Sequence, residues 1–313
     1  MDILTDVLQT LHLESSLYLR SELGAPWGLH VPAAPTMLFH AITAGSCWMY
    51  FLDGCEPVFL TGGDIIVLPQ GEEHALVDDR ATAVPPPNVP EATNKHCARL
   101  YLGGAGARSS IVCGSFHFHR NLSSFLLAPL PRLIHLSSED WRTNSWLVAT
   151  MQFLFEETGS DRPGTDLIRQ HLTDILFVQI LRTWIARQHE QVPGWLQALH
   201  DEHIHKAIAA IHEHPGAQWT VDLLAQEAGL GRASFAARFA QLVGEPPMHY
   251  LTRWRMQVAG EMLRIGSKSI DTIATELGYF SRASFTKAFK RHMGVGMGAY
   301  RRAVRGGVTE KRA

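Results

Sequence analysis

The sequence predicts an α+β protein in which an N-terminal β-barrel precedes a C-terminal all-α domain with two helix-turn-helix motifs. Three observations lead to this fold class. The 313 residues exceed the length of one typical domain. The hydrophobic pattern changes from short, turn-bounded runs to a helical period after residues 129–131. The last third of the chain contains an internal repeat.

The N-terminal segment is expected to form a short amphipathic helix, because Leu4, Val7, Leu8 and Leu11 are spaced to share one helical face. Its acidic residues and its lack of a basic cluster differ from a secretory signal. The chain has no apolar run near the ~20 residues that a membrane-spanning helix requires. Its 4 cysteines are scattered and include no C-x-x-C pair. We therefore expect a cytoplasmic protein without a membrane partner.

The front half of the chain contains β-prone runs that are each bounded by turn residues. The runs are TMLFHAITAG, SCWMYFLDG, PVFLTGG, DIIVLPQG and SIVCGSFHFH. Their spacing predicts a small barrel or sandwich of antiparallel strands, and we take the barrel as the prediction. The Pro- and Gly-rich segment 79–108 interrupts the runs and predicts a long surface loop.

Two helices are expected to follow the strands, over 141–157 and 164–188. The apolar face of the second helix is wider than one domain core requires, with Leu172 and Leu176 among its members. Two alternatives explain this width: burial on both sides within its own domain, or burial against a second copy. We expect a homodimer that forms through this helix. Residues 1–190 would then be an effector and dimerisation domain, joined by a linker over 191–202 to a helical domain over 203–304.

The repeat in the helical domain begins at Thr220 and again at Ser269. Small, turn-forming and aromatic residues recur at matched positions of the two copies. The matched pairs are Ala225 and Ala274, Gly229 and Gly278, Phe235 and Phe285, Phe239 and Phe289, and Gly244 and Gly294. A helix, a glycine-containing turn and a second helix anchored by two phenylalanines form a helix-turn-helix unit. The chain therefore contains two such units.

Charge is unevenly distributed along the chain, although the net charge is only −2. Residues 1–194 carry 12 basic and 20 acidic side chains, whereas residues 230–313 carry 15 basic and 5 acidic ones. A basic background around two helix-turn-helix units predicts binding to double-stranded DNA. A rigid connecting helix over 248–263 would place the two recognition helices in successive major grooves, about 34 Å apart.

The two recognition helices are expected over 232–241 and 281–291. With their phenylalanines inward, each presents a different outward set. The DNA-facing candidates are Arg232, Ala233, Ala236, Ala237 and Arg238 in the first helix, and Arg282, Ala283, Thr286, Lys287 and Lys290 in the second. Alanines pack only against thymine methyl groups, so the first helix should specify weakly and the second should read base edges. Arg238, Arg253 and Arg291 are expected at phosphates.

The order and spacing of these residues over 203–304 resemble the AraC/XylS family of bacterial transcription regulators. The matching positions include Leu224-Ala225, Phe239, Pro247, Tyr250-Leu251, Arg255, Ile273-Ala274, Gly278-Tyr279, Ala288-Phe289-Lys290 and Tyr300-Arg301. The chain departs from the family at Gly296-Met297-Gly298, where a proline is usual. The resemblance implies a sequence-specific regulator at a promoter operator, with RNA polymerase as a further partner.

The segment from Gly63 to His74 fits G-x5-P-x-G-x2-H, the second sequence motif of cupins. This resemblance covers about 37–118 and implies that His74 points into the barrel. The first cupin motif supplies H-x-H and a glutamate as metal ligands. Here His40 remains, but Ile42 replaces the second histidine and Ser46 or Cys47 stands near the glutamate position. The resemblance therefore implies a sensor domain and not an enzyme; the alternative is a cupin-type metalloenzyme fused to a DNA-binding tail.

His40, His74 and Cys113 are the candidate effector or metal residues of the barrel. Two histidines and a thiolate would suit Zn(II) or another divalent metal. The alternative is a pair of hydrogen-bonded core histidines beside a small buried thiol. Cys113 as a redox switch would need a lowered pKa and access to solvent. The overall pattern is similar to regulators that respond to reactive chlorine species, but the sequence leaves the effector, the operator and the choice between activation and repression open.

Overall fold

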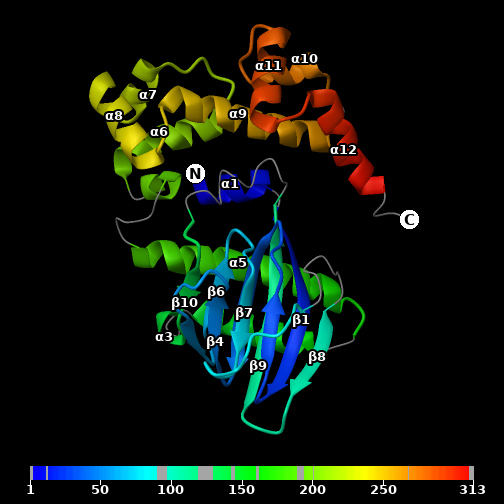
Figure 1. Cartoon of the computed structure of the whole chain (residues 1–313). Coiled ribbons are helices and arrows are strands. Elements are labelled where there is room, and N and C mark those ends of the chain that lie inside the picture. Colours follow the sequence, from blue (N-terminus) through cyan, green and yellow to red (C-terminus); the bar gives the residue numbers. More distant parts are fainter. Residues whose placement is uncertain are drawn as a thin grey trace. The chain divides into compact units, whose positions relative to one another are not determined.

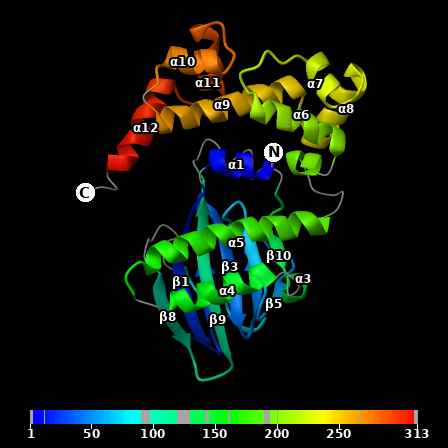
Figure 2. The ribbon, with the colours of Figure 1, turned by 180° about the vertical axis from the view of Figure 1, so that it is seen from behind.

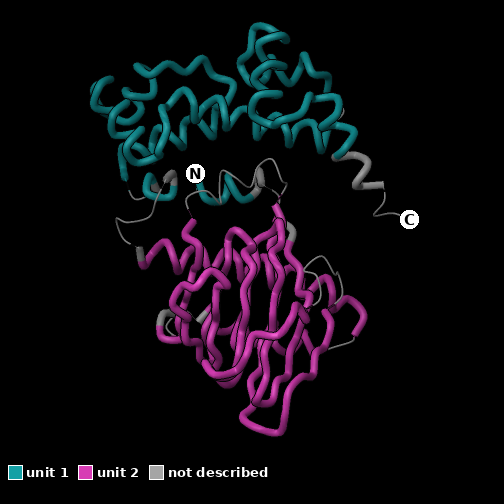
Figure 3. The backbone as a smooth tube through the Cα atoms, viewed as in Figure 1, with its two compact units in different colours: residues 1–12, 119–129, 190–313 teal, residues 13–118, 130–189 magenta. Residues whose placement is uncertain are grey.

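The computed structural model describes residues 3–11, 13–89, 97–118, 130–141, 145–159, 162–188, 194–199, 201–266 and 268–309. Contacts divide the chain into two compact units (Figure 3). The sheet unit comprises residues 13–118 and 130–189, and the helical unit comprises residues 1–12, 119–129 and 190–313. We describe each unit by itself.

The described residues of the sheet unit form two β-sheets (Figure 1). The strands are β1 (Glu14–Gly24), β2 (Gly28–Val31), β3 (Met37–Ala44), β4 (Ser46–Phe51), β5 (Val58–Thr61), β6 (Ile65–Leu68), β7 (His74–Val77), β8 (Ala98–Gly103), β9 (Arg108–His117) and β10 (Ile134–Leu136). The six-stranded sheet has the order β10-β6-β3-β9-β1-β8, and the four-stranded sheet has the order β2-β7-β4-β5. Buried apolar side chains from both sheets form one core.

The predicted closed barrel is wrong, because the described strands form two separate sheets. The chain passes from one sheet to the other at tight corners, where glycines adopt positive φ. Gly45 (φ +79°) joins β3 to β4, and Gly71 (φ +62°) lies between β6 and β7. Barrel closure needs hydrogen bonding between every pair of neighbouring strands. The strand alternation in the sequence indicates which side chains face inward, but it carries no information on edge pairing.

The predicted loop over 79–108 is also wrong for part of its length, because it contains strand β8. β8 pairs in parallel with β1, with Leu19 opposite Ala98 and Gly24 opposite Gly103. Leu100 and Leu102 pack against the core from β8. This strand is short, and the glycines that follow it are typical of loops, so the local sequence pattern does not reveal it. Residues 90–96 of the predicted loop lie outside the described residues.

Helices α4 (Ser145–Thr158) and α5 (Thr165–Gln188) confirm the two helices expected after the strands. A single turn, α3 (Ser138–Trp141), precedes them. α4 packs against α5, and α5 lies against β1 and β9 of the six-stranded sheet (Figure 2). Leu176, Phe177 and Ile180 are fully or almost fully buried on α5. This face of α5 therefore belongs to the core of its own chain.

The helical unit contains both predicted helix-turn-helix motifs. Its helices are α1 (Ile3–Leu11), a 3-10 helix η2 (Gly194–Leu199), α6 (Glu202–Glu213), α7 (Val221–Glu227), α8 (Arg232–Val243), α9 (Pro247–Ile265), α10 (Ile270–Glu276), α11 (Arg282–Met293) and α12 (Met297–Thr309). α7 and α8 form the first motif, α10 and α11 form the second, and α9 connects them. No helix of the described residues is long and apolar enough to cross a membrane.

Capping residues and glycines determine where these helices begin and end. The Thr220 side chain accepts a hydrogen bond from the Leu223 N–H at the start of α7, and Ser269 caps α10 in the same way. Gly229 and Gly278 adopt φ of +66° and +76° in the two turns. α12 begins at Met297, so the missing proline does not prevent this helix from forming.

Two segments of the helical unit differ from the predicted division of the chain. α1 confirms the N-terminal helix, but its Ile3 and Val7 are fully buried within the unit that contains α6 and α9. Residues 194–199 of the predicted linker form η2, which packs against α8. The boundaries at 190 and 203 stay a prediction; residues 191–193 and 200 lie outside the described residues.

We expect Gly71→Ala to destabilise the sheet unit by about 3 kcal/mol, because an added Cβ would be forced against backbone. That Cβ would lie 2.1 Å from the Ala34 carbonyl oxygen and 2.2 Å from that of Thr36. Gly54→Ala is the matched control, since Gly54 also has positive φ (+84°) but has no atom within 4 Å of the new Cβ. It should cost only about 1 kcal/mol. Urea unfolding of both variants measures the difference, and equal losses would contradict the steric argument.

Candidate nucleic-acid interface and effector site

Buried phenylalanines orient both recognition helices. Phe235 and Phe239 of α8 and Phe285 and Phe289 of α11 are fully buried. Because residues four apart share a helical face, the opposite face of each helix is open. All predicted DNA-facing residues are exposed except Ala236, which is half-buried. Their contact with DNA stays a prediction.

Each motif contains the same exposed ion pair at the start of its recognition helix. Arg232 Nη1 lies 2.9 Å from Asp222 Oδ2, and Arg282 Nη1 lies 3.1 Å from Asp271 Oδ2. Both partners of each pair are more than half exposed. Exposed ion pairs contribute little to stability. The two guanidinium groups can therefore exchange their carboxylate for a phosphate at small cost.

The other basic residues predicted to contact DNA differ in whether they have a carboxylate partner and in how far they are buried. Arg238 Nη2 lies 2.6 Å from Asp201 Oδ2, and Asp201 also caps α6. Arg253 is paired with Glu245 and lies over the Tyr250 ring, and burial lowers its pKa. Among the described residues, neither Lys287 nor Lys290 has a carboxylate partner, and both are exposed. 

The three candidate effector residues meet in the interior of the sheet unit. His40 on β3 and Cys113 on β9 are direct neighbours across the six-stranded sheet. His40 Nδ1 lies 3.0 Å from Cys113 Sγ, and His40 Nε2 lies 2.7 Å from His74 Nε2. His74 begins β7 of the four-stranded sheet, so this contact joins the two sheets. His74 Nδ1 lies 2.7 Å from the Glu72 carbonyl oxygen.

These contacts form a hydrogen-bond chain with a single direction. The Glu72 carbonyl only accepts, so His74 Nδ1–H donates and His74 Nε2 accepts when the ring is neutral. His40 Nε2–H then donates to His74, and His40 Nδ1 accepts from the Cys113 thiol. Burial lowers the pKa of His40 and lowers that of His74 to about 4, so both rings stay neutral near pH 7. Burial also raises the pKa of Cys113, which keeps the thiol protonated.

The geometry of the three residues does not fit one metal ion. His40 directs its two ring nitrogens to different partners, so His74 and Cys113 lie at opposite edges of its ring. A metal needs donor atoms that converge on one point. Within the described part of the chain, no group of three or more His, Cys, Asp or Glu residues is arranged to hold a metal ion. The arrangement fits the alternative of hydrogen-bonded core histidines. Cys113 is buried and burial raises the pKa of its thiol, whereas a redox switch needs a lowered pKa and access to solvent.

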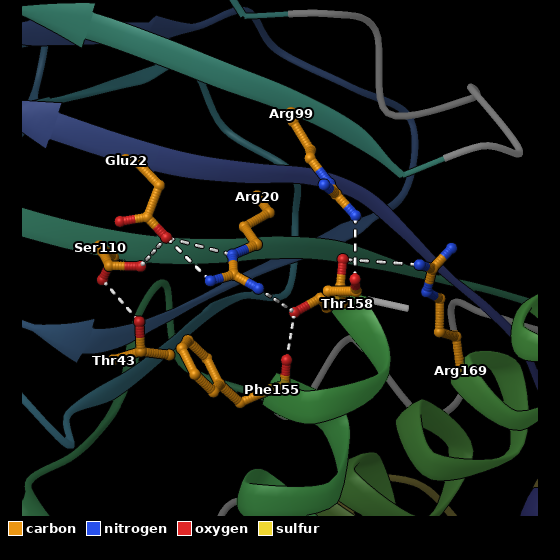
Figure 4. A network of polar contacts seen from close by, with 9 residues as sticks. Arg20, Glu22, Thr43, Arg99, Ser110, Phe155, Thr158 and Arg169 are labelled. Carbon is orange, nitrogen blue, oxygen red and sulfur yellow. Dashed lines mark hydrogen bonds and ion pairs between the residues drawn. The ribbon is translucent and has the colours of Figure 1, made fainter. Parts of the chain in front are cut away.

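A second polar cluster, which the sequence did not indicate, connects the six-stranded sheet to α4 (Figure 4). Arg20 Nη2 donates to Glu22 Oε1 at 2.9 Å, and Arg20 Nη1 donates to Thr158 Oγ1 at 3.4 Å. Arg99 donates to the Gly159 carbonyl at 3.1 Å, and Arg169 donates to the Glu157 carbonyl at 2.9 Å. Carbonyl groups at a helix C-terminus lack intrahelical partners and carry partial negative charge.

Arg20 and Arg99 thus hold the end of α4 against β1 and β8, and Arg169 holds it against α5. Arg20 and Arg99 also line a cavity of about 250 Å³, together with Glu22, Tyr101 and Gly159. The signal for this cluster was present in the sequence, since Arg20 and Glu22 are two residues apart and share a strand face. It was missed because strand β1 was not among the predicted runs.

Comparison with known proteins gives two family matches. Residues 2–186 match the family model described as cupin, and residues 224–303 match the helix-turn-helix domain. A cupin-like domain joined to a helix-turn-helix domain defines a class of DNA-binding transcription regulator.

Relatives of similar length place the chain more narrowly. It is 32% identical to an AraC-like transcription regulator of Streptomyces lividans over 96% of this chain and 98% of the relative. It is 32% identical to the regulator AlkR of Acinetobacter baylyi, covering 93% and 96% of the two chains. It is 29% identical to the RCS-specific transcriptional activator RclR of Escherichia coli, covering 97% and 99%. The chain belongs to the AraC family of transcription regulators.

A solved structure was also found for the C-terminal part alone. The DNA-binding domain of AdpA, in complex with a target DNA, is 31% identical and covers 34% of this chain and 95% of that chain, with a TM-score of 0.33.

We expect Cys113→Val to destabilise the sheet unit by about 1–3 kcal/mol, because His40 Nδ1 would be left buried without a donor. Cys113→Ser keeps a donor at this position and should cost less. Urea unfolding of both variants at pH 7 tests the hydrogen-bond chain. A valine variant as stable as the serine variant would indicate that Cys113 contributes only packing.

Proposed function

We propose that the chain regulates transcription by binding a promoter operator with α8 and α11. One observation carries this proposal: both repeated recognition helices bury their phenylalanines and leave open faces with basic and polar side chains. Arg282, Thr286, Lys287 and Lys290 can donate to base edges or phosphates, so α11 supplies most of the base readout. Ala233, Ala236 and Ala237 of α8 supply apolar contacts to thymine methyl groups. Arg232, Arg238 and Ala283 are proposed to contact the DNA beside these bases.

The cupin-like domain is proposed to sense a small effector and to change the affinity for the operator. The relatives differ in name, since RclR is described as RCS-specific and another relative is called AlkR. The effector of this chain therefore does not follow from its family. An effector in this domain can act on DNA binding only if it binds two states of the protein unequally. The Arg20, Arg99 and Arg169 cluster is a route from the sheet to α4 and α5.

The homodimer predicted through α5 is proposed to use the exposed apolar side chains of α5 and of its neighbour α4, and not the buried Leu176. Leu176 is fully buried in its own chain, so a charge there would disrupt the domain and would not report on dimerisation. The exposed apolar side chains of these helices are Trp146, Phe153, Phe155, Leu167, Ile168 and Ile175. Ile168, Leu172 and Ile175 form one helical stripe. Two copies would double the number of recognition helices and raise operator affinity.

We also propose a cytoplasmic location and a contact with RNA polymerase at the promoter. Both are inferred from the regulatory role of the bacterial relatives and not from particular residues of this chain. Among the relatives, those with assigned roles are transcription regulators, which supports a protein that is not an enzyme.

We expect Lys287→Ala to weaken specific operator binding by about 1–3 kcal/mol if the lysine reads a base. Binding to random DNA should change much less, and Ala236→Ser, on the alanine-rich helix, should have a smaller effect. Gel-shift assays with the DNA upstream of the protein's own gene and with a random duplex, each over a range of salt concentrations, measure both effects. An equal loss on both DNAs would show that Lys287 contacts only phosphate. A wild-type protein without DNA affinity at low salt would overturn the proposed function.

For the dimer, we expect Ile175→Glu to give folded monomers, because a charge would replace an apolar contact at the interface. Ile175→Val keeps the apolar surface and is the matched control. Sedimentation at micromolar concentration gives the mass of each form. A wild-type protein with the mass of one chain would contradict the dimer.

A further inference from the structure

One residue interrupts the repeat between the two helix-turn-helix motifs, and it is Phe280. Gly229 and Gly278 are 49 residues apart, whereas Arg232 and Arg282 are 50 apart. The turns are otherwise alike. Leu230 N–H donates to the Ala225 carbonyl, and Tyr279 N–H donates to the Ala274 carbonyl, both at 2.9 Å. The N-cap follows directly in the first motif, at Gly231, but comes one residue later in the second, at Ser281.

Phe280 is also the most exposed large apolar side chain among the described residues. It is 92% exposed, and the next most exposed are at 71%. Its neighbour Tyr279 already supplies the inward aromatic contact, with ring centroids 5.1 Å from Phe285, and Arg255 lies over its ring. Because the first motif folds without a counterpart, the fold of the unit does not require Phe280. An aromatic ring in water, with no role in packing, is a candidate for burial in a complex.

The surroundings of Phe280 favour DNA as that partner. Ser281, the next residue, caps α11, so Phe280 directly precedes the N-terminal turn of the helix that carries Arg282, Thr286 and Lys287. Helix-turn-helix proteins approach base edges with this end of the recognition helix. The exposed lysines of α11 complement a polyanion. An apolar ring beside them can pack against the C5-methyl group of thymine and the neighbouring sugar.

We propose that Phe280 is a specificity-determining residue that packs against a thymine methyl group at the edge of the site read by α11. The proposal rests on the proposed function, since it names one contact of that same DNA complex. The second motif would then read DNA through the polar side chains of α11 and through one apolar contact from Phe280.

The test is selection of binding sites from a random duplex library with the full-length protein. Wild type, Phe280→Ser, Phe280→Leu and a matched control, Ile265→Ser, are compared. Ile265 is 71% exposed at the end of α9, outside both recognition helices. We expect Phe280→Ser to lose the preference for thymine at one position and to bind the wild-type site about tenfold more weakly. Phe280→Leu should keep most of the preference, and Ile265→Ser should match wild type.

Replacement of that thymine by uracil removes only the methyl group. It should weaken wild-type binding about fourfold, as expected for one buried methyl group, and leave Phe280→Ser unaffected. Thermal unfolding of each variant checks that the exposed substitutions leave the fold intact.

Three results would overturn the inference. If Phe280→Ser selects the wild-type site with unchanged affinity, Phe280 does not contact DNA. If it binds DNA normally but fails to activate purified RNA polymerase, the ring contacts protein instead. If wild type selects no site at all, the proposed function fails and this inference fails with it.

Discussion

Burial of two phenylalanines per motif is the constraint on which the DNA-reading surface depends. Phe235 and Phe239, and their equivalents Phe285 and Phe289, have no exposed surface. Exposure of any of them would cost about 1.5–3 kcal/mol of hydrophobic free energy. Each recognition helix is thereby fixed in rotation about its own axis. Packing of the core therefore determines which side chains of each recognition helix face solvent in the free protein.

A second constraint is the need to satisfy the buried polar groups that lie between the two sheets. The His40 and His74 rings meet there and use all their nitrogens in hydrogen bonds to each other, to Cys113 and to the Glu72 carbonyl. A buried polar chain is stable only when every member is satisfied. The histidine of the cupin motif, His74, has both ring nitrogens in hydrogen bonds of this chain. The same satisfaction of every nitrogen makes the site a poor match for a metal.

The sequence predicted those parts of the molecule that rest on local periodicity. Both recognition helices and α5 follow from apolar residues that recur every three or four positions, and the repeat follows from matched residues 49 or 50 positions apart. The sheet topology did not follow, because closure and edge pairing depend on contacts between distant strands. Strand β8 pairs with β1 across about eighty residues of sequence, so the local sequence does not show that Arg99 lies beside Arg20. The sequence correctly predicted that His40, His74 and Cys113 lie together, but the direction of their hydrogen bonds needed coordinates.

The position of α1 determines how the chain can be divided for experiments. Ile3 and Val7 are buried in the helical unit, and Asp6 Oδ2 lies 3.6 Å from His212 Nδ1 of α6. A fragment that starts at the linker would therefore leave an apolar surface on α6 and α9 open to water, and such surfaces promote aggregation. α1 and the C-terminal helices thus belong to one compact unit, although most of the chain separates them in sequence. An affinity tag at the N-terminus would precede a helix that packs against α6 and α9.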